Sequence, residues 1–159
     1  MISSEKKIGD SKIISTELVL PHHTNQLGNL LGGQLMHWID ICAALAAGKH
    51  SQRVCVTASV DRIDFHQAIK LGNAVTLYAS VNRVFKTSME VGVKVFTQSF
   101  KEGIKAHSNT AYLTFVAVDE EGNPVKAIQG IPETEEEKRR YDEALKRREH
   151  RLQTRSKKD

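Results

Sequence analysis

Cysteine is scarce in this sequence, and the two that occur have no ligand-like spacing. Cys42 and Cys55 are the only cysteines among 159 residues, and each lies among apolar residues, away from any CxxC or Cys/His pattern. Both are predicted to be reduced, buried thiols, as in a protein of a reducing, intracellular compartment. A disulfide framework is therefore excluded, and we expect no metal at these positions.

Long apolar runs are absent too. No apolar stretch of the signal-peptide kind occurs in the first fifteen residues, MISSEKKIGDSKIIS. No later run approaches the roughly twenty apolar residues of a membrane span. We therefore expect a cytoplasmic protein without a membrane partner. A chain of this length fits one domain whose core is large enough to fold without disulfides or metals.

A large excess of one charge is also lacking. The 23 Lys and Arg residues nearly balance 19 Asp and Glu residues, for a net charge of +4. Most of the excess lies in residues 147–158, which contain almost no apolar side chains. This segment could contact phosphates, but we expect a solvated tail, because such charge runs are commonly disordered. No helix-turn-helix unit precedes the patterned part of the chain, so a nucleic-acid partner is not expected.

What is present falls into three zones along the chain. We expect a flexible leader in residues 1–12, a single patterned domain in residues 13–132 and a charged helix or tail in residues 133–159. In the last zone, acidic residues stand four positions before basic ones, which predicts a helix to about Leu152. This helix has little apolar surface to bury, so we expect it to pack loosely or fray.

The patterned domain begins with a strand, a polar loop and a helix. Residues 13–20 alternate apolar and polar side chains, as in a strand, and residues 21–31 are rich in Asn, His and Gly. Gly32 and Gly33 open a helix that continues through residues 34–47 without a breaker. Gly48 makes a reasonable C-terminal stop.

After the helix, the apolar period changes to two. Four segments alternate β-branched or aromatic residues with polar ones: 54–65, 74–84, 88–100 and 106–118. The connections between them are too short for parallel crossovers, so the strands are predicted to be antiparallel. We therefore predict an α+β fold, with a curved antiparallel sheet of about five strands wrapped around one long helix.

One carboxylate does not fit the apolar character of the helix. Only Gln34, His37 and Asp40 interrupt its apolar surface, and they fall along one narrow line. Burying an unpaired carboxylate costs several kcal/mol or drives it to protonate, so Asp40 should be hydrogen-bonded, face water in a cavity, or both. The pattern alone fits a catalytic carboxylate and a purely structural one equally well.

The loop before the helix favours the catalytic interpretation. Its polar side chains and glycines lead into the helix N-terminus, where backbone N–H groups lack partners and the helix dipole favours negative charge. Such a place suits a developing oxyanion, and glycine at Gly32 and Gly33 lets a carbonyl group approach the backbone closely. The alternative is a glycine pair that only lets helix and sheet pack tightly.

Asn25, residues 28–33 and Asp40 together resemble a known family, the hotdog-fold acyl-CoA thioesterases of the acyl-CoA hydrolase branch. The stretch TNQLGNLLGGQLMHWIDICAA is similar to that branch's Asn-x-x-Gly-x-x-x-Gly-Gly pattern, with the acid seven residues after the second glycine. The glycine pair alone is a weak signal. In combination with the further segments below it becomes a strong one.

Two further segments carry the same resemblance. Residues 58–65 with Gly72 behind them agree with the family, and so does Arg83 followed by residues 87–91. The resemblance covers about residues 15–118. It implies a hotdog fold, dimers that share one continuous sheet, and commonly trimers of dimers, which gives a homohexamer.

The resemblance also implies a composite site between two protomers. The residue matching Asn25 comes from one protomer and the residue matching Asp40 from the other. In the family, the segment matching Arg83, Thr87 and Ser88 lies near the coenzyme A moiety, which makes these three residues candidate coenzyme A contacts. Ordinary strand surface is the alternative for each of them.

The expected reaction is hydrolysis of acyl-CoA, in the service of fatty acid metabolism. Asp40 is expected to act as general base on a water molecule and Asn25 to orient that water or the carbonyl, while the N–H groups of Gly32 and Gly33 hold the oxyanion. Attack by the carboxylate itself, through a mixed anhydride, is an alternative. We expect no metal and no separate cofactor, because coenzyme A is part of the substrate.

Other functions fit the sequence less well. No serine lies in a nucleophile elbow and Cys42 is on the apolar helix, which disfavours Ser-His-Asp and Cys-His enzymes. His22 and His23 have no acidic or cysteine cluster nearby, so a polar loop is favoured over a metal site. A dehydratase of the same fold, or an acyl-CoA sensor without turnover, stays an alternative to the thioesterase.

Overall fold

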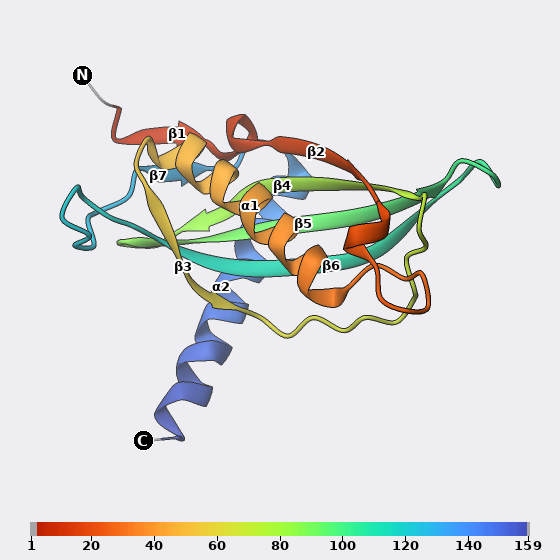
Figure 1. Cartoon of the computed structure of the whole chain (residues 1–159). Coiled ribbons are helices and arrows are strands. Elements are labelled where there is room, and N and C mark those ends of the chain that lie inside the picture. Colours follow the sequence, from red (N-terminus) through yellow and green to blue (C-terminus); the bar gives the residue numbers. More distant parts are fainter. Residues whose placement is uncertain (1–2, 159) are drawn as a thin grey trace.

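The protein folds as a curved sheet with a helix on each face, seen in a computed structural model that describes residues 3–158 (Figure 1). From the N-terminus the elements are β1 (Glu5–Lys7), η1 (Ile8–Ser11), β2 (Ile13–Leu18), η2 (Pro21–His23), α1 (Gly32–Ser51), β3 (Cys55–Val60), β4 (Ala74–Val84), β5 (Ser88–Ser99), β6 (Ile104–Ala117), β7 (Gln129–Ile131) and α2 (Glu135–Ser156). Five antiparallel strands form the main sheet in the order β2-β4-β5-β6-β3. The predicted α+β class and antiparallel sheet are therefore confirmed.

Differences from the predicted elements lie at their ends. α1 starts at Gly32 as predicted but continues past Gly48 to Ser51, because His50 and Ser51 are buried and stabilise the last turn. The helix ends where Gln52 takes a left-handed conformation, with φ of 55°, and donates its N–H to the Gly48 carbonyl. The strand predicted over residues 54–65 is shorter and ends with β3.

The concave face of the sheet packs against α1 and forms the core. Met89, Val91, Val93 and Val95 of β5 are fully buried, which confirms the predicted alternation along this strand. Cys42 is buried as predicted, and burial raises the pKa of its thiol to about 11. Both cysteines are free thiols, although Cys55 is only half-buried.

The expected flexible leader is instead part of the fold. β1 pairs in parallel with β7, and Ile8 in the following turn is 2% exposed. The buried hydroxyl of Ser11 accepts a hydrogen bond of 2.8 Å from the backbone N–H of Val81 in β4. These contacts attach the segment to the sheet, which its polar composition does not reveal.

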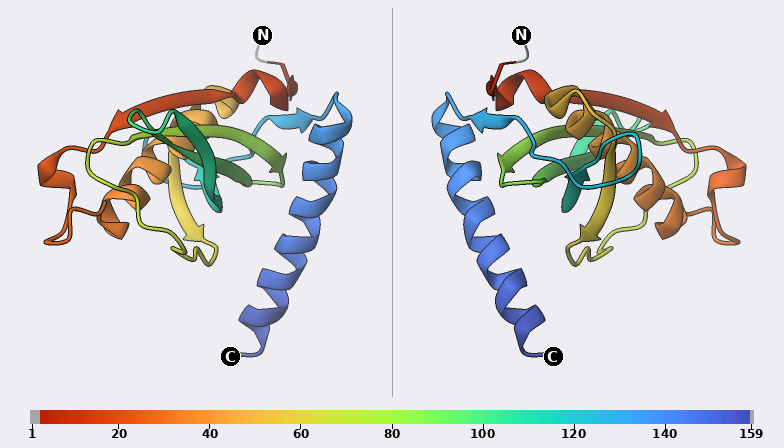
Figure 2. Two further views of the ribbon diagram at one scale, coloured as in Figure 1. Left: turned by 90° about the vertical axis from the view of Figure 1, so that its right-hand side faces the viewer. Right: turned by 90° about the vertical axis from the view of Figure 1, so that its left-hand side faces the viewer.

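α2 lies across the outer face of the main sheet, on the side away from α1 (Figure 2). A capping box begins it, in which the Thr134 hydroxyl accepts the Glu137 N–H at 3.1 Å and the Glu137 carboxylate accepts the Thr134 N–H at 3.2 Å. The helix expected in this zone is present and continues to Ser156, beyond the predicted end near Leu152, while residues 152–158 are exposed. It packs more closely than expected, because Ala144 is fully buried. Neither long helix of the described chain is apolar enough over sufficient length to cross a membrane.

Candidate active site

Asp40 of α1 is held at the edge of the sheet and not within the core. The Thr57 hydroxyl of β3 donates a hydrogen bond of 2.7 Å to Oδ1 of Asp40. Asp40 is half-buried and Thr57 is exposed. Within residues 3–158, Oδ2 of Asp40 has no hydrogen-bond partner. A carboxylate with one oxygen fixed and the other free can take a proton from water, which favours the catalytic interpretation of Asp40.

Thr57 stands at an irregularity of β3. It pairs with Phe115 of β6, whereas Ser59 pairs with Thr114, so Ala58 is an extra residue in the strand. A β-bulge of this kind bends a strand and re-aims its side chains, and bulges are common beside active sites. The sequence does not mark Thr57 as a site residue, because threonine is an ordinary strand residue.

The side of α1 next to Asp40 is not covered in the single chain. Ile41 is 46% exposed and Leu45 is 54% exposed, although a helix that is apolar on nearly every side is expected to be buried. β3 is the neighbouring edge strand, and among the described residues it pairs with β6 alone. An apolar patch beside an unpaired strand edge marks an interaction surface.

Asn25 lies in the loop before α1, and its side chain bonds within that loop. Its Oδ1 accepts backbone N–H groups from Leu27 at 2.9 Å and from Asn29 at 3.2 Å, which fixes the loop conformation. No hydrogen bond joins Asn25 to Asp40 in the part of the chain described. Asp40 is eight residues beyond Gly32, or about 12 Å along the helix axis. Within one protomer, the N-terminus of α1, where this loop ends, therefore lies well away from the carboxylate.

The N-terminus of α1 is open. No side chain caps it, and the N–H groups of Gly32 and Gly33 find no acceptor in residues 3–158. A Cβ added at Gly33 would meet nothing within 4 Å, and one at Gly32 would only make an ordinary 3.7 Å contact with the ring of Phe65. Tight packing within the chain therefore does not explain the glycine pair, and the space in front of it is free for another group.

A cavity of about 250 Å³ adjoins this helix N-terminus. It combines apolar walls with a few polar groups, as small-molecule sites do. Its lining residues include Asn29, Leu30, Gly32, Leu35, Phe65 and Asn109.

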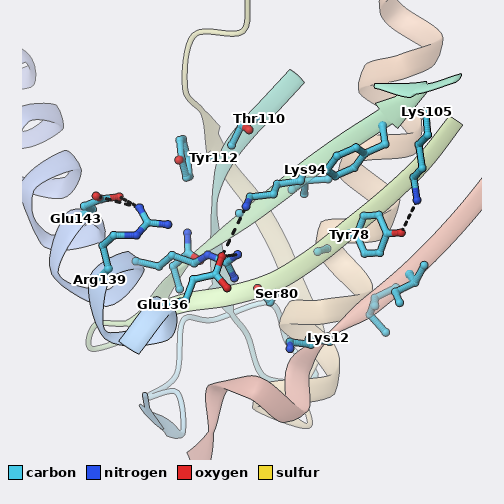
Figure 3. Close-up of a pocket in the computed structure, with 18 residues that line it drawn as sticks. Lys12, Tyr78, Ser80, Lys94, Lys105, Thr110, Tyr112, Glu136, Arg139 and Glu143 are labelled. Atoms are coloured by element: carbon cyan, nitrogen blue, oxygen red, sulfur yellow. Dashed lines mark hydrogen bonds and ion pairs between the residues drawn. The ribbon is translucent and has the colours of Figure 1, made fainter. Parts of the chain in front are cut away.

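A larger cavity lies elsewhere, in a groove of about 490 Å³ between α2 and the outer face of the sheet (Figure 3). Two of the three lysines that line it are paired, Lys105 with the hydroxyl of Tyr78 at 3.0 Å and Lys94 with Glu136 at 3.7 Å. None of the predicted site residues lines this groove. It is therefore separate from the surroundings of Asp40.

The three candidate coenzyme A contacts lie at the β4–β5 turn, next to α2. The Arg83 guanidinium stands 3.9 Å from the centre of the Tyr141 ring and donates to the Tyr141 carbonyl at 3.2 Å. The Ser88 hydroxyl accepts from Arg148 at 3.2 Å. Thr87 is half-buried in the turn itself. Within one protomer these residues do not meet Asp40.

Comparison with known proteins relates this arrangement to a family. The model of the thioesterase superfamily matches residues 27–104. A Bacillus subtilis protein named as an uncharacterized acyl-CoA thioester hydrolase is 41% identical over 138 residues, which cover 87% of this chain and 80% of the relative. The chain belongs to the thioesterase superfamily.

Other relatives of this thioesterase-superfamily chain have similar names. Acyl-coenzyme A thioesterase 11 of Mus musculus is 42% identical over 96% of this chain, which spans only 25% of that longer protein. The crystal structure of an apo-hexameric acyl-CoA thioesterase has 41% identity and a TM-score of 0.90, with 96% of this chain and 97% of that chain covered.

A further solved structure contains ligands. The acyl-CoA hydrolase of Staphylococcus aureus, in complex with butyryl coenzyme A, coenzyme A and coenzyme A disulfide, is 36% identical, with a TM-score of 0.89 over 97% of this chain and 94% of that chain. Structures of that enzyme also exist with an asparagine, an aspartate or a threonine replaced by alanine. Along that chain these residues are separated by 15 and then 17 positions.

Proposed function

We infer that this chain is an acyl-CoA thioesterase, which hydrolyses acyl-CoA to a free fatty acid and coenzyme A. Relatives at 36–42% identity with acyl-CoA hydrolase or thioesterase names support this function. The observation that carries it is the Asp40 carboxylate, held by Thr57 at 2.7 Å through one oxygen and free at the other within residues 3–158. Such a carboxylate beside an open face is suited to activate water.

Asn25, Asp40 and Thr57 are the proposed residues of the site. They are separated by 15 and then 17 positions, as are the asparagine, aspartate and threonine replaced in the Staphylococcus aureus acyl-CoA hydrolase. Identical residue types at identical spacing support a shared site. They also support adding Thr57 to the two residues predicted from the sequence.

The proposed site is composite, with its two halves on different protomers. One half holds Asp40 and Thr57; the other holds Asn25 and the open helix N-terminus, about 12 Å away along α1. The free edge of β3, with exposed Ile41 and Leu45 beside it, is suited to pair with β3 of a second copy. A hexameric neighbour supports three such dimers per assembly.

Water attack on the thioester follows from these positions. Asp40 takes a proton from a water molecule oriented by Asn25 while the water oxygen attacks the carbonyl carbon. The carbonyl oxygen becomes an oxyanion, held by the N–H groups of Gly32 and Gly33 at the positive end of the helix dipole. Collapse of this intermediate breaks the C–S bond, and the departing coenzyme A thiolate takes the proton from Asp40. Coenzyme A enters as part of the substrate, so no further cofactor is needed.

Arg83, Thr87 and Ser88 are retained as proposed coenzyme A contacts. α2 holds Arg83 and Ser88 on the outer side of the sheet, away from the Asp40 of the same protomer. They are therefore proposed to contact a coenzyme A bound at a site of another subunit. Alanine at Arg83 should then raise KM for acyl-CoA with little change in kcat.

Replacement of Asp40 tests the function. Asp40→Asn keeps the size of the side chain and its hydrogen bond from Thr57 but removes the base, so release of free thiol from acyl-CoA should fall by at least about a hundredfold. Asp64→Asn, which alters an exposed carboxylate paired with Arg62, is the control and should retain full activity. Near-normal hydrolysis by Asp40→Asn in an unchanged oligomer would overturn the proposed role.

Further assays distinguish the alternative mechanisms and functions. Single turnover in ¹⁸O water places label in Asp40 only if its carboxylate attacks the thioester directly. A dehydratase would hydrate crotonyl-type substrates, and a sensor would bind acyl-CoA without releasing thiol. A panel of esters from acetyl to palmitoyl coenzyme A would also define the acyl-chain preference.

A further inference from the structure

β3, the strand that carries Thr57, is an edge strand of the main sheet within one protomer. In residues 3–158 it pairs with β6 alone, and five of its six residues are exposed. The register shift between Thr57 and Ser59 interrupts even this pairing. In the proposed dimer the outer edge of β3 pairs with a second copy, but the bulge still interrupts the ladder beside Thr57. Because a bulge bends and re-aims the strand locally, the direction of the Thr57 hydroxyl also depends on how the end of β3 is fixed.

Asp61, the residue directly after β3, is fixed twice. Its backbone N–H donates to the Tyr112 carbonyl of β6 at 2.9 Å, and its carboxylate accepts a hydrogen bond of 2.9 Å from Arg151 of α2. The chain then has no regular structure as far as His66. Asp61 is therefore the anchor nearest to Thr57 at this end of the strand.

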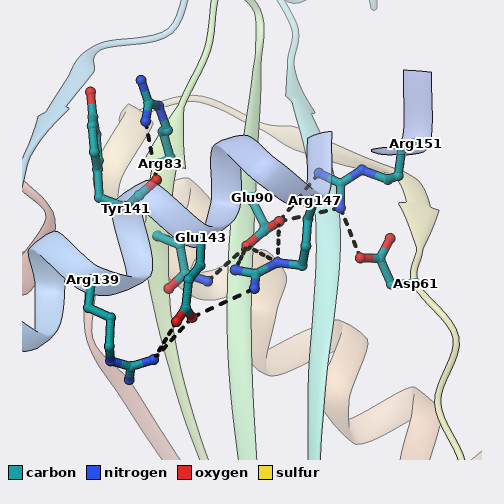
Figure 4. Close-up of polar contacts among 9 residues, drawn as sticks. Asp61, Arg83, Glu90, Arg139, Tyr141, Glu143, Arg147 and Arg151 are labelled. Atoms are coloured by element: carbon teal, nitrogen blue, oxygen red, sulfur yellow. Dashed lines mark hydrogen bonds and ion pairs between the residues drawn. The ribbon is translucent and has the colours of Figure 1, made fainter. Parts of the chain in front are cut away.

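A buried carboxylate orients Arg151 (Figure 4). Glu90 of β5 is 0% exposed, and its Oε2 accepts from both terminal nitrogens of Arg151 at 3.3 Å. Its Oε1 accepts from Arg147 at 2.7 Å and from Asn82 at 3.0 Å. Arg151 thus bridges two carboxylates, one in the centre of the sheet and one at the end of β3. Charge-assisted bonds of this kind are stronger than neutral ones.

We propose that Arg151 is a positioning residue of the thioester site: by holding Asp61 it fixes β3, so that the Thr57 hydroxyl meets Asp40. This role rests on the proposed function, because it concerns the same site. α2 lies on the face of the sheet away from α1 (Figure 2), so the effect of Arg151 passes through Asp61 and the strand. A misplacement of about 1 Å can cost roughly a hundredfold in rate, so modest loosening of β3 lowers turnover.

Variants at the two ends of the ion pair test this role. Arg151→Ala and Asp61→Asn should each lower kcat by roughly tenfold and leave KM within about twofold. Arg151→Lys can still pair with Asp61 and should retain most of the activity. Arg155→Ala removes the same charge one turn later in α2, where the side chain has no partner in residues 3–158, and should behave like the unaltered enzyme.

A double variant separates positioning from general stability. When Arg151→Ala is added to Thr57→Val, kcat should fall by less than about twofold further, because the hydroxyl that Arg151 positions is already absent. Hydrogen exchange of the β3 amides should rise in Arg151→Ala while exchange in α1 stays unchanged.

The outcomes distinguish this role from the function on which it rests. An unaltered chain that hydrolyses no acyl-CoA overturns the proposed function. A hydrolysing chain in which Arg151→Ala keeps its kcat overturns the positioning role. A folded Asp61→Asn variant with full activity also overturns the positioning role. The same conclusion follows if Arg151→Ala lowers kcat equally in the unaltered chain and in the Thr57→Val background.

Discussion

At the scale of single residues, the orientation of the site carboxylate depends on one hydroxyl. Thr57 donates to Asp40 at 2.7 Å, and in residues 3–158 this is the only hydrogen bond that the carboxylate makes. A side chain held by one bond on an open face turns freely once the bond is lost. In the proposed mechanism, Thr57 therefore contributes to turnover by orienting the base, without taking part in bond making itself.

Removal of this hydroxyl should reduce turnover. Thr57→Val keeps the shape of the side chain and deletes the donor, and kcat should fall by roughly tenfold to a hundredfold with a smaller change in KM. Thr57→Ser keeps the donor and should stay within about threefold of the unaltered enzyme. Steady-state release of thiol from a single acyl-CoA measures both. A valine variant with full kcat would show that the bond does not orient the base.

The two halves of the Asp40–Thr57 pair differ in what the sequence reveals. Asp40 is predicted because a carboxylate stands out on an apolar helix. Thr57 contacts Asp40 only because a bulge 17 residues later turns its hydroxyl toward α1, and no local pattern predicts that. Asn25 was identified through the resemblance, since a polar residue in a polar loop carries little signal by itself.

His50 gives a second residue-scale prediction, on stability. It is 1% exposed, its Nε2 lies 2.9 Å from the Ile128 carbonyl, and its Nδ1 has no partner in the described chain. Burial, with a smaller contribution from Lys6, lowers the pKa of His50 below the usual 6.5. The neutral ring therefore contributes stability that is fully present above about pH 6.5 and is lost as the pH falls through the lowered folded-state pKa.

Urea unfolding measures this effect. Between about pH 7 and pH 5, the unaltered protein should lose about 1 kcal/mol more stability than His50→Gln, which keeps a donor for Ile128 but does not titrate. His37→Gln, on the exposed side of α1, should keep the pH dependence of the unaltered protein. Identical pH dependence in His50→Gln would assign the acid sensitivity to other groups.

At the scale of elements, α2 is held on the sheet mainly by charge. Favourable i, i+4 pairs predict the helix itself, but its docking depends on Glu90, which the alternation of β5 assigns to the polar face. That face is covered by α2, and Glu90 is fully buried there with Arg147 and Arg151. The docking depends on residues nearly sixty positions apart, so local patterns do not predict it.

Neutralising Glu90 tests this attachment. Glu90→Gln leaves Arg147 and Arg151 without their shared counter-ion, and the free energy of unfolding should fall by about 3 kcal/mol. Glu149→Gln, an exposed change on the same helix, should alter it by less than about 0.5 kcal/mol. Urea denaturation of both variants makes the comparison. Equal stability of the two would mean that apolar contacts, such as that of Ala144, hold the helix.

At the scale of the whole molecule, the proposed site needs residues of two chains. The sequence predicts the α+β fold because helix and strand periods are local signals. It cannot by itself predict which surfaces meet in an assembly, since Ile41 and Leu45 look like core residues until the fold leaves them exposed. Their exposure beside the β3 edge, and the distance between the two halves of the site, both point to a second protomer.

Complementation between two inactive variants tests the shared site. Asn25→Ala disables one half and Asp40→Ala the other, so a mixed dimer contains one doubly altered site and one intact site. Random pairing makes half of the dimers mixed, and the refolded mixture should recover about a quarter of the unaltered activity per chain. Each variant alone should stay inactive.

The matched control pairs two changes that fall in the same half of the site. A mixture of Asp40→Ala and Thr57→Val chains has no intact site in any dimer, because Asp40 and Thr57 belong to one protomer. Its rate should therefore not exceed that of Thr57→Val alone. If the Asn25→Ala and Asp40→Ala mixture is also inactive while mixed dimers form, each site must lie within one protomer, and the separation of about 12 Å along α1 would have to be bridged by movement of the loop.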